Sequence, residues 1–328
     1  MKPPATAADF LAMHGWGDGQ ISPVAGDASF RRYFRVQEGD RQAILMDAPP
    51  PHEDPKPFIA MAEYLANSGF AAPEIFARDL TQGLVLLEDF GEHRMREHLD
   101  QQPEDEESIY RQVIDLLREL HRIPAAPVPA YDWLQYLREV NLLTEWYCPA
   151  QQLDVDAEAF VACWKQVLAP VLAAQNNPVT VMRDYHAENI MLLADGRLGL
   201  LDFQDALVGH PAYDLVSMLQ DARRDVSDEL EEKMLAYYLA DRNEEAAQEF
   251  RSHYAILGAQ RNTKIIGIFT RLCVRDGKQR YLEFLPRMWR LLEKDLQHPA
   301  LEPVAQWYAR NIPAEVRSRS IPLPEKTE

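Results

Sequence analysis

The sequence predicts an α+β fold in two lobes, a small β-rich lobe followed by a larger, mainly helical one. The chain has 328 residues, and at roughly 150 residues per domain this length favours two domains. Short apolar runs bounded by Gly, Pro or Asp fill the chain up to Gly91, whereas later segments carry apolar residues at helical spacings. We therefore predict a first lobe over residues 1–91, a second lobe over 92–312 and a flexible tail over 313–328.

The first lobe is expected to contain three strands and one helix. Residues 30–36, 42–47 and 83–88 are alternating or apolar runs of the length that strands have. Residues 56–67 carry apolar side chains at spacings of three and four, which predicts a helix. The proline-rich residues 49–57 are expected to form a loop, because proline lacks the backbone donor that helices and central strands need.

The second lobe is expected to be built from long helices with one interruption. Residues 179–203 contain short apolar runs around polar positions and a glycine turn, which predicts a hairpin-like patch. Polar segments that a rigid scaffold positions are where chemistry concentrates. The helices are predicted over residues 105–122, 133–147, 157–174, 212–222, 227–238, 244–271 and 279–296.

The composition excludes several classes of protein. With 34 Lys+Arg against 52 Asp+Glu the net charge is −18, which opposes binding to nucleic acid or to an anionic membrane surface. The three cysteines are far apart and show no metal-binding spacing. No segment has the ~20 apolar residues that a membrane span needs. We expect a cytoplasmic protein, and no pattern points to an obligate protein partner.

Three polar residues in the interruption form a set suited to phosphoryl transfer. Asn189 follows Asp184 by 5 residues, and Asp202 follows Asn189 by 13. Transfer of a phosphoryl group from ATP needs a carboxylate at the acceptor hydroxyl and oxygen ligands for magnesium. Mg²⁺ takes few protein oxygens, so one Asn and one Asp are adequate. The alternative is that these residues cap helices and turns.

The same segment resembles a known family of kinases. Arg183-Asp184-x-x-x-x-Asn189 is similar to the catalytic loop of kinases, and Asp202-Phe203-Gln204 is similar to their D-F-G motif with the glycine replaced. A later Tyr213-Asp214-Leu215 completes the order found in the aminoglycoside-phosphotransferase-like kinases. Together with MDAPP and LLDFQDALVGHPAYDLVSMLQDAR, the segment RDYHAENIM resembles the bacterial anomeric kinases of N-acetylmuramate and N-acetylglucosamine, over roughly residues 8–310.

This resemblance implies a protein-kinase-like bilobal fold, with a small antiparallel sheet and one helix in the first lobe. It also implies ATP and Mg²⁺ as cofactors, and phosphorylation of the anomeric hydroxyl of an amino sugar in peptidoglycan recycling. Asp184 would accept the proton of the acceptor, Asp214 would hold the catalytic loop in shape, and Arg183 would brace neighbouring loops. Asn189 and Asp202 would bind the metal.

The phosphate-binding part of the first lobe departs from the kinase pattern. Residues 26–30 (GDASF) stand where the phosphate-covering turn should be, and Ser29 and backbone N–H groups could cradle phosphate. The usual lysine of the third strand is missing, since Met46 or Asp47 takes its place. We expect Arg31 or Arg32 to neutralise the triphosphate instead.

Three further expectations follow from the comparison with kinases. Glu63 on the first-lobe helix has no strand lysine to pair with and is expected to be a surface charge. Residues 86–91 resemble a hinge, where backbone groups of Glu88 and Phe90 would pair with adenine. Met182 replaces the usual histidine of the catalytic loop and is expected to fill the same space.

The acceptor is expected to be a small molecule. Only 12 residues separate Asp202 from Asp214, too few for the activation segment that lays a peptide across a protein kinase. His186 and Asp205 are candidates for contact with the acceptor. Residues 261–294 hold nine Lys+Arg against three acidic residues, and Arg261 and Lys264 in it could attract an anionic acceptor. A solvated helix face is the alternative. The aromatic or amide residues that suit a sugar ring, or else a helix core, are Trp133, Tyr136, Asn141, Trp146 and Tyr147.

Other interpretations stay open at this point. The acceptor could be another hydroxylated metabolite, such as an aminoglycoside, choline, homoserine or a fructosamine. The missing lysine and altered glycine loop also allow a pseudokinase that binds nucleotide without catalysis. Intact Asp184, Asn189 and Asp202 argue against that reading, because decayed kinases usually lose one of them.

Overall fold

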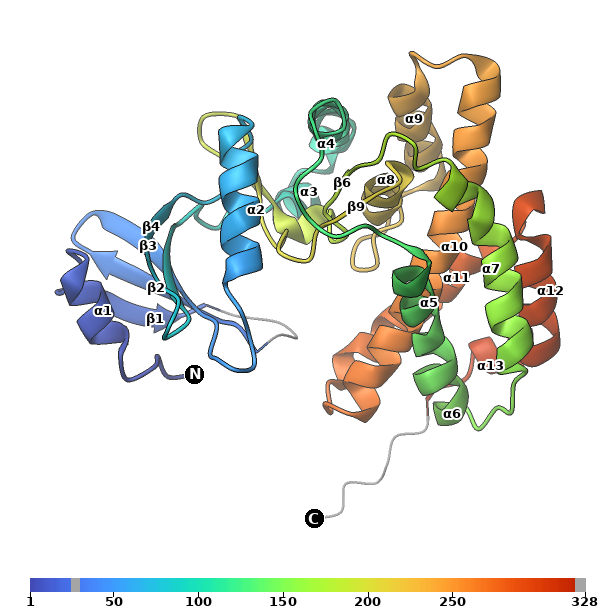
Figure 1. The fold of residues 1–328 in the computed structure, drawn as a ribbon, viewed down its shortest axis with the longest axis horizontal. Coiled ribbons are helices and arrows are strands. Elements are labelled where there is room, and N and C mark those ends of the chain that lie inside the picture. Colours follow the sequence, from blue (N-terminus) through green and yellow to red (C-terminus); the bar gives the residue numbers. More distant parts are fainter. Residues whose placement is uncertain (25–29, 322–328) are drawn as a thin grey trace. The chain divides into compact units, whose positions relative to one another are not determined.

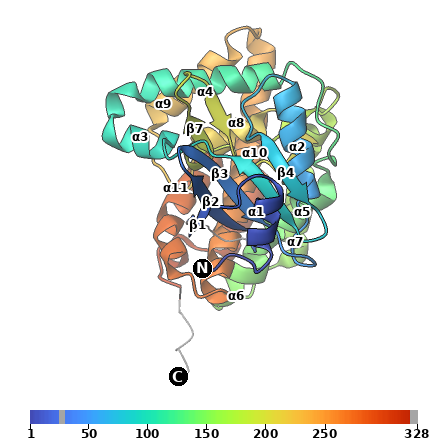
Figure 2. The same cartoon turned by 90° about the vertical axis from the view of Figure 1, so that its left-hand side faces the viewer.

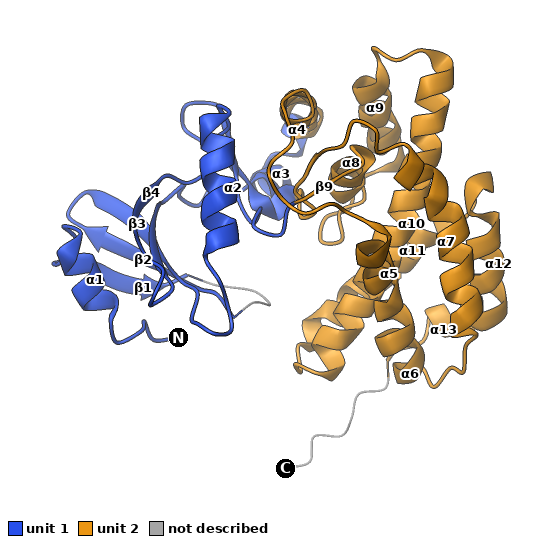
Figure 3. Ribbon diagram, in the orientation of Figure 1, with its two compact units in different colours: residues 1–105, 187–206 blue, residues 106–186, 207–328 orange. Residues whose placement is uncertain are grey.

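A computed structural model describes residues 1–24 and 30–321, and the chain in it divides into two compact units (Figure 1, Figure 3). The first unit comprises residues 1–105 and 187–206, and the second comprises residues 106–186 and 207–328.

A five-stranded sheet in the order β1-β2-β3-β5-β4 forms the centre of the first unit. Every neighbouring pair is antiparallel. The predicted antiparallel sheet is therefore confirmed, with two strands more than the apolar runs indicated. The strands are β1 (Gln20–Pro23), β2 (Arg32–Glu38), β3 (Arg41–Asp47), β4 (Ile75–Asp79) and β5 (Leu84–Glu88).

Helices cover both faces of this sheet (Figure 2). Because side chains alternate along a strand, Leu84 and Leu86 of β5 point to one face, where Phe10 and Leu11 of α1 (Ala7–Met13) join the same core cluster. The other face carries α2 (Lys56–Asn67), at the residues predicted for it.

The first unit extends beyond Gly91 and takes in a second segment of the chain. Residues 93–105 form α3 (Met95–Gln101) and the 3₁₀ turn η1 (Pro103–Asp105). Helix α3 packs against β7 (Ile190–Leu192) and the 3₁₀ turn η3 (Ala187–Asn189), which draws residues 187–206 into this unit. Strand β7 pairs with β8 (Leu198–Leu200) as the predicted hairpin.

The second unit is helical apart from the short antiparallel pair of β6 (Val179–Val181) and β9 (Leu207–Gly209). Its predicted helices are present, although the one expected over 133–147 changes to a π-helical turn at Leu143. Its helical elements are α4 (Glu106–Leu120), α5 (Trp133–Leu142), η2 (Leu143–Tyr147), α6 (Cys148–Ala150), α7 (Ala157–Ala173), α8 (Ala212–Leu219), α9 (Asp228–Leu239), α10 (Glu244–Val274), η4 (Gln279–Phe284), α11 (Leu285–Asp295), η5 (Pro299–Leu301), α12 (Glu302–Asn311) and α13 (Ala314–Arg317).

Helix α10 is the central helix of the second unit. It is 31 residues long and contacts α5, α8 and α11. Asn243 caps its first turn by accepting a hydrogen bond from the N–H of Ala246 at 2.9 Å. Side chains are buried on all sides from Phe250 to Cys273, as expected for a helix that neighbours surround.

The first part of the predicted tail is packed. Val316 in α13 and Ile321 are buried, and Arg317 forms an ion pair with Glu293 at 2.9 Å. The rest of the tail, residues 322–328, lies outside the described residues. The three cysteines are free and buried. Within residues 1–24 and 30–321, no helix is long and apolar enough to cross a membrane.

Candidate active site

Residues 182–186 of the second unit form a loop that follows β6 and is held by Asp214. The carboxylate of Asp214, on α8, accepts hydrogen bonds from the N–H groups of Met182 at 2.7 Å and Arg183 at 2.9 Å. Inside the loop, the N–H of Asp184 donates to the carbonyl of Met182 at 2.8 Å. Met182 is buried, as expected for a residue that fills space there.

The backbone of this loop is strained at Arg183, whose φ is 68°. A residue with a side chain rarely adopts this left-handed conformation, so surrounding contacts must stabilise it. Ser217 on α8 donates to the carbonyl of Arg183 at 3.1 Å, and the Arg183 guanidinium forms an ion pair with Glu139 on α5. Arg183 therefore links the loop to two helices.

Glu139 is the centre of a buried polar cluster that the sequence did not reveal. Its carboxylate accepts hydrogen bonds from Tyr131, Arg183 and Gln260, and Lys264 Nζ lies 3.3 Å from it. Burial alone raises the pKa of Glu139, but the positive charges of Lys264 and Arg183 outweigh it and lower the pKa to about 2. Its charged partners, Arg183 and Lys264, are far away in the sequence, so no local pattern marks it.

Asp184 carries the carboxylate that we predicted as the proton acceptor, and it is half-buried. Burial by itself raises its pKa, but the positive charges of Lys264, Arg183 and Arg261 help to lower the pKa below the ordinary aspartate value. Asp184 is therefore ionised at neutral pH, which is the state in which it can accept a proton.

His186 is buried at the end of the loop and has a protein partner there. Arg223 Nη1 donates to its Nε2 at 3.1 Å, and burial lowers the pKa of His186, so the ring is neutral at physiological pH. The contact with Arg223 gives His186 a bracing role.

The first unit places Asn189 and Asp202 at the two ends of the β7–β8 hairpin. The side-chain amide of Asn189 donates to Asp202 Oδ2 at 3.4 Å, and the N–H of Leu201 donates to the carbonyl of Asn189 at 3.0 Å. Asp202 is the second candidate residue with a strained backbone, since its φ is 57°. Gln204, which replaces the glycine of the motif, donates to Asp202 Oδ1 at 2.7 Å.

The donor set at this hairpin fits a magnesium ion. Asn189 and Asp202 offer an amide oxygen and an exposed carboxylate within hydrogen-bond reach of each other, and such hard oxygens are the ligands that Mg²⁺ prefers. In the described part of the chain, no three His, Cys, Asp or Glu side chains gather into a cage for a metal. A small set is adequate for Mg²⁺, because phosphate and water complete its coordination.

The cations predicted for the triphosphate already have carboxylate partners in the first unit. Arg32 on β2 is the cross-strand neighbour of Asp47 on β3, and its Nε donates to the buried Asp47 carboxylate at 2.7 Å. Arg31 pairs with Glu53 at 3.1 Å. Of the other residues predicted here, Met46 is buried, and Ser29 lies outside the described residues.

Arg31 lies in the electrostatic field of the metal-binding candidates. Burial lowers its pKa, but interactions with Tyr33, Glu53, Asp205 and Asp202 raise the pKa above the usual arginine value. Asp205 is itself exposed. This places Arg31 in the neighbourhood of Asp202.

The hinge candidates differ in what they can offer to adenine. The N–H of Glu88 already donates to the carbonyl of Glu74 at 2.8 Å, and the Glu88 carboxylate accepts from the N–H of Glu74 at 3.2 Å. The Glu88 N–H is therefore committed to the protein. The ring of Phe90 lies so close to Gly199 of β8 that a Cβ there would be 2.8 Å from it. Glu63 pairs with Arg78 at the surface.

Two of the aromatic residues suggested for a sugar ring belong to the core. Tyr136 is fully buried and stacks on Tyr131 with ring centroids 4.0 Å apart, and Tyr147 is buried with its hydroxyl donating to the carbonyl of Val316 at 3.3 Å. Trp133, Asn141 and Trp146 are half-buried. Tyr136 and Tyr147 therefore fit the alternative given above, a helix core, and not a surface for a sugar ring.

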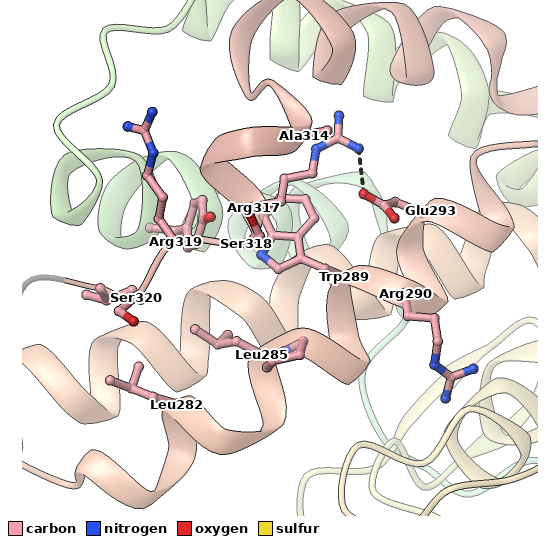
Figure 4. A pocket seen from close by; sticks show the side chains of 13 residues that line it. Leu282, Leu285, Trp289, Arg290, Glu293, Ala314, Arg317, Ser318, Arg319 and Ser320 are labelled. Carbon is pink, nitrogen blue, oxygen red and sulfur yellow. Dashed lines mark hydrogen bonds and ion pairs between the residues drawn. The ribbon is translucent and has the colours of Figure 1, made fainter.

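Tyr147 also lines a cavity of about 540 Å³ in the second unit (Figure 4). Its lining includes apolar side chains of α11, such as Leu285 and Trp289, and the ion pair of Arg317 with Glu293. It contains none of the residues predicted for catalysis, so we do not place the reaction there.

The family of the chain follows from comparison with known proteins. Residues 20–250 match the phosphotransferase enzyme family, and the chain belongs to it. An N-acetylmuramate/N-acetylglucosamine kinase of Caulobacter vibrioides is 36% identical over 95% of this chain and 98% of that protein. A kinase with the same description from Pseudomonas aeruginosa is 37% identical over 87% of each chain. The predicted family and enzyme class are confirmed.

Solved structures confirm the fold. A choline/ethanolamine kinase family protein from Mesorhizobium loti superposes with a TM-score of 0.65 at 14% identity, covering 94% of this chain and 98% of that one. An ADP-bound aminoglycoside phosphotransferase gives a TM-score of 0.56 at 15% identity, covering 88% of this chain and 97% of that one. The chain thus has the kinase-like fold that its motifs predicted.

Proposed function

We propose that this chain is an ATP-dependent kinase that phosphorylates the anomeric hydroxyl of N-acetylmuramate and N-acetylglucosamine, a step in peptidoglycan recycling. The observation that carries the proposal is the 36% identity to a kinase with this description along 95% of this chain and 98% of that protein. Use of ATP also agrees with a cytoplasmic location.

Asp184 is the residue we propose for the chemical step. The anomeric hydroxyl of the sugar donates a hydrogen bond to its ionised carboxylate, loses its proton to it and attacks the γ-phosphorus of ATP in line, while the bond from the γ-phosphorus to the β,γ-bridging oxygen breaks and ADP leaves. An anomeric hydroxyl is more acidic than an ordinary alcohol, so the carboxylate has mainly to orient it. Asp214 and Arg183 act as positioning residues, because they hold the backbone on which Asp184 stands.

Asn189 and Asp202 are the residues that would hold Mg²⁺. When bound, the ion supplies positive charge to the phosphate oxygens of ATP. Gln204 keeps the Asp202 carboxylate in place through its hydrogen bond of 2.7 Å. Arg31 would add positive charge for the triphosphate, with Ser29, Arg32 and the backbone of Glu88 and Phe90 as the other nucleotide-binding candidates.

The test is an assay of the purified chain with Mg·ATP and a panel of acceptors. N-acetylmuramate and N-acetylglucosamine should each stimulate ADP release, and phosphorus NMR of the product should place the phosphate on the anomeric carbon. Choline, homoserine, a fructosamine and an aminoglycoside complete the panel.

An Asp184→Asn variant controls for contaminating kinases, since it removes the proposed proton acceptor and should show no turnover. Phosphorylation of another panel member in preference to both sugars would replace the proposed acceptor. Binding of ATP without turnover of any acceptor would favour a pseudokinase.

A further inference from the structure

Arg261 on α10 is a buried cation that forms no ion pair with a carboxylate of the described residues, although its charge acts on Asp184 and Asp214. Its side chain is 4% exposed, and its Nη1 is fully buried with no hydrogen-bond partner among residues 1–24 and 30–321. An arginine is charged at any physiological pH, and a buried charge without a partner is strongly unfavourable. A bound anion would supply the hydrogen-bond acceptor that Nη1 lacks.

Other cations of the same basic stretch are neutralised within the second unit. Lys264, one turn after Arg261, lies 3.3 Å from Glu139, a carboxylate that it shares with Arg183. The pairs on and after the end of α10 are Arg275 with Asp276, Arg287 and Arg290 with Asp225, and Lys294 with Asp228 and Glu231. Arg271 in the last turn of α10 also has a buried Nε without a hydrogen-bond partner in the described part of the chain, so the electrostatic attraction that we predicted for residues 261–294 narrows to Arg261 and Arg271. Of these two, Arg261 is the one whose charge acts on Asp184.

The surroundings of Arg261 connect it to the acceptor side of the reaction. Helix α10 packs on α8, where Lys264 Nζ lies 3.1 Å from the hydroxyl of Tyr213, the neighbour of Asp214. The positive charge of Arg261 acts on Asp184, His186 and Asp214 of the same unit. Arg261 thus belongs to the neighbourhood of Asp184, the residue that receives the acceptor hydroxyl.

We propose that Arg261 binds a carboxylate of the acceptor and is the residue through which the enzyme favours N-acetylmuramate over N-acetylglucosamine. The planar guanidinium matches a carboxylate with two parallel hydrogen bonds. N-acetylmuramate carries a lactyl ether with such a carboxylate, and N-acetylglucosamine lacks it. This inference rests on the proposed function.

The experiment compares the two sugars in the Arg261→Gln variant, which keeps a polar side chain but removes the charge. We expect kcat/KM for N-acetylmuramate to fall roughly 10- to 100-fold, the effect of one charged hydrogen-bonded contact. With N-acetylglucosamine, kcat/KM should fall by a clearly smaller factor, because only the effect of the Arg261 charge on Asp184 is lost. Arg275→Gln is the matched control, since Arg275 lies at the exposed end of the same helix and pairs with Asp276.

A neutral substrate gives a second readout that a folding defect would not reproduce. Calorimetry gives the Kd of each sugar for wild type and for Arg261→Gln. The methyl ester of N-acetylmuramate should bind to wild type with the same weak Kd that N-acetylmuramate has for the variant. The variant should bind the acid and the ester with equal Kd. Arg261→Lys should recover part of the preference for the acid, because it restores the charge without the planar fork.

Three results would overturn the inference. An equal loss of kcat/KM for both sugars would assign Arg261 to the phosphate or to the catalytic loop. Unchanged kinetics with N-acetylmuramate would show that the carboxylate lies elsewhere. Full discrimination between acid and ester in Arg261→Gln would exclude the contact. Failure of the wild-type enzyme to phosphorylate either sugar would instead refute the proposed function.

Discussion

Asp214 shows how one buried carboxylate can fix the geometry of a catalytic loop. It accepts two backbone N–H groups, and burial raises its pKa to about 7 despite those hydrogen bonds. An asparagine at this position would keep only one acceptor oxygen, and its NH₂ group would face the N–H of Met182 or Arg183. Asp214→Asn should therefore lower kcat at least about 10-fold, while KM for ATP stays within about threefold, because the loop that carries Asp184 is misplaced.

Steady-state kinetics of Asp214→Asn checks this prediction. Asp154→Asn, an exposed carboxylate of the same unit, is the control and should behave as wild type. A change confined to KM for ATP would show that Asp214 does not act through the catalytic loop.

Glu139 makes stability depend on pH. Its pKa is lowered from 4.5 to about 2 by Lys264 and Arg183, so the folded state binds this proton less readily than the unfolded chain. The resulting stabilisation is complete above about pH 4.5 and is lost as the pH falls towards 2. Glu139→Gln should cost about 3–5 kcal/mol at pH 7, because two buried cations lose their counter-charge.

Urea unfolding at two pH values measures the effect. Between about pH 7 and about pH 3, the stability difference between wild type and Glu139→Gln should shrink by about 2 kcal/mol. Glu145→Gln, an exposed residue of the following turn, provides the baseline. A difference that is independent of pH would show that Glu139 does not carry the charge assigned to it.

Residues differ in how far the sequence could reveal them. Asp184, Asn189, Asp202 and Asp214 were found because their spacing along the chain is itself a motif. Glu139 was missed because its partners Arg183 and Lys264 lie 44 and 125 residues away, and only the tertiary fold brings these charges together.

Helices α10 and α5 approach each other closely at Gly267. A Cβ at Gly267 would lie 2.4 Å from the carbonyl carbon of Leu142, the last residue of α5. Gly267→Ala gains helix propensity but must push two backbones apart, so we expect a net loss of about 1–3 kcal/mol. Displacement of α10 should also weaken N-acetylmuramate turnover through Arg261.

Chemical denaturation and the sugar assay test this pair of effects. Gln248→Ala, exposed on the first turns of α10, should stay within about 0.5 kcal/mol of wild type. If Gly267→Ala were as stable as Gln248→Ala, the close approach to α5 would be refuted.

Elements with strong periodicity were predictable, and short or interrupted ones were not. Helix α2 was placed at its observed bounds because its apolar residues repeat at helical spacing. Strand β4 (IFARD) was missed because it lies at the sheet edge with a single buried residue. The π-helical turn after Leu142 was missed because it retains helical periodicity, and it lies where Gly267 approaches.

For the whole molecule, binding of Mg·ATP should raise thermal stability in a way that depends on Asp202. A ligand at 100 times its Kd stabilises the folded state by about 2.7 kcal/mol. We expect a thermal shift with Mg·ATP that falls sharply on chelation with EDTA and in Asp202→Asn. Asp195→Asn, an exposed carboxylate in the turn of the same hairpin, should keep the full shift. A shift insensitive to EDTA and to Asp202→Asn would remove the metal from this hairpin.

The buried cysteines allow the second unit to be followed on its own. Cys148, Cys163 and Cys273 all belong to the second unit, and residues 1–105 and 187–206 contain none. Burial raises the pKa of Cys148 to about 12 and that of Cys163 to about 11, and alkylating reagents attack only the thiolate. Reaction with iodoacetamide therefore requires local opening of the helical unit. The labelling rate of each thiol, read by mass spectrometry with nucleotide or sugar added, would tell which ligand slows the opening of that unit without any engineered probe.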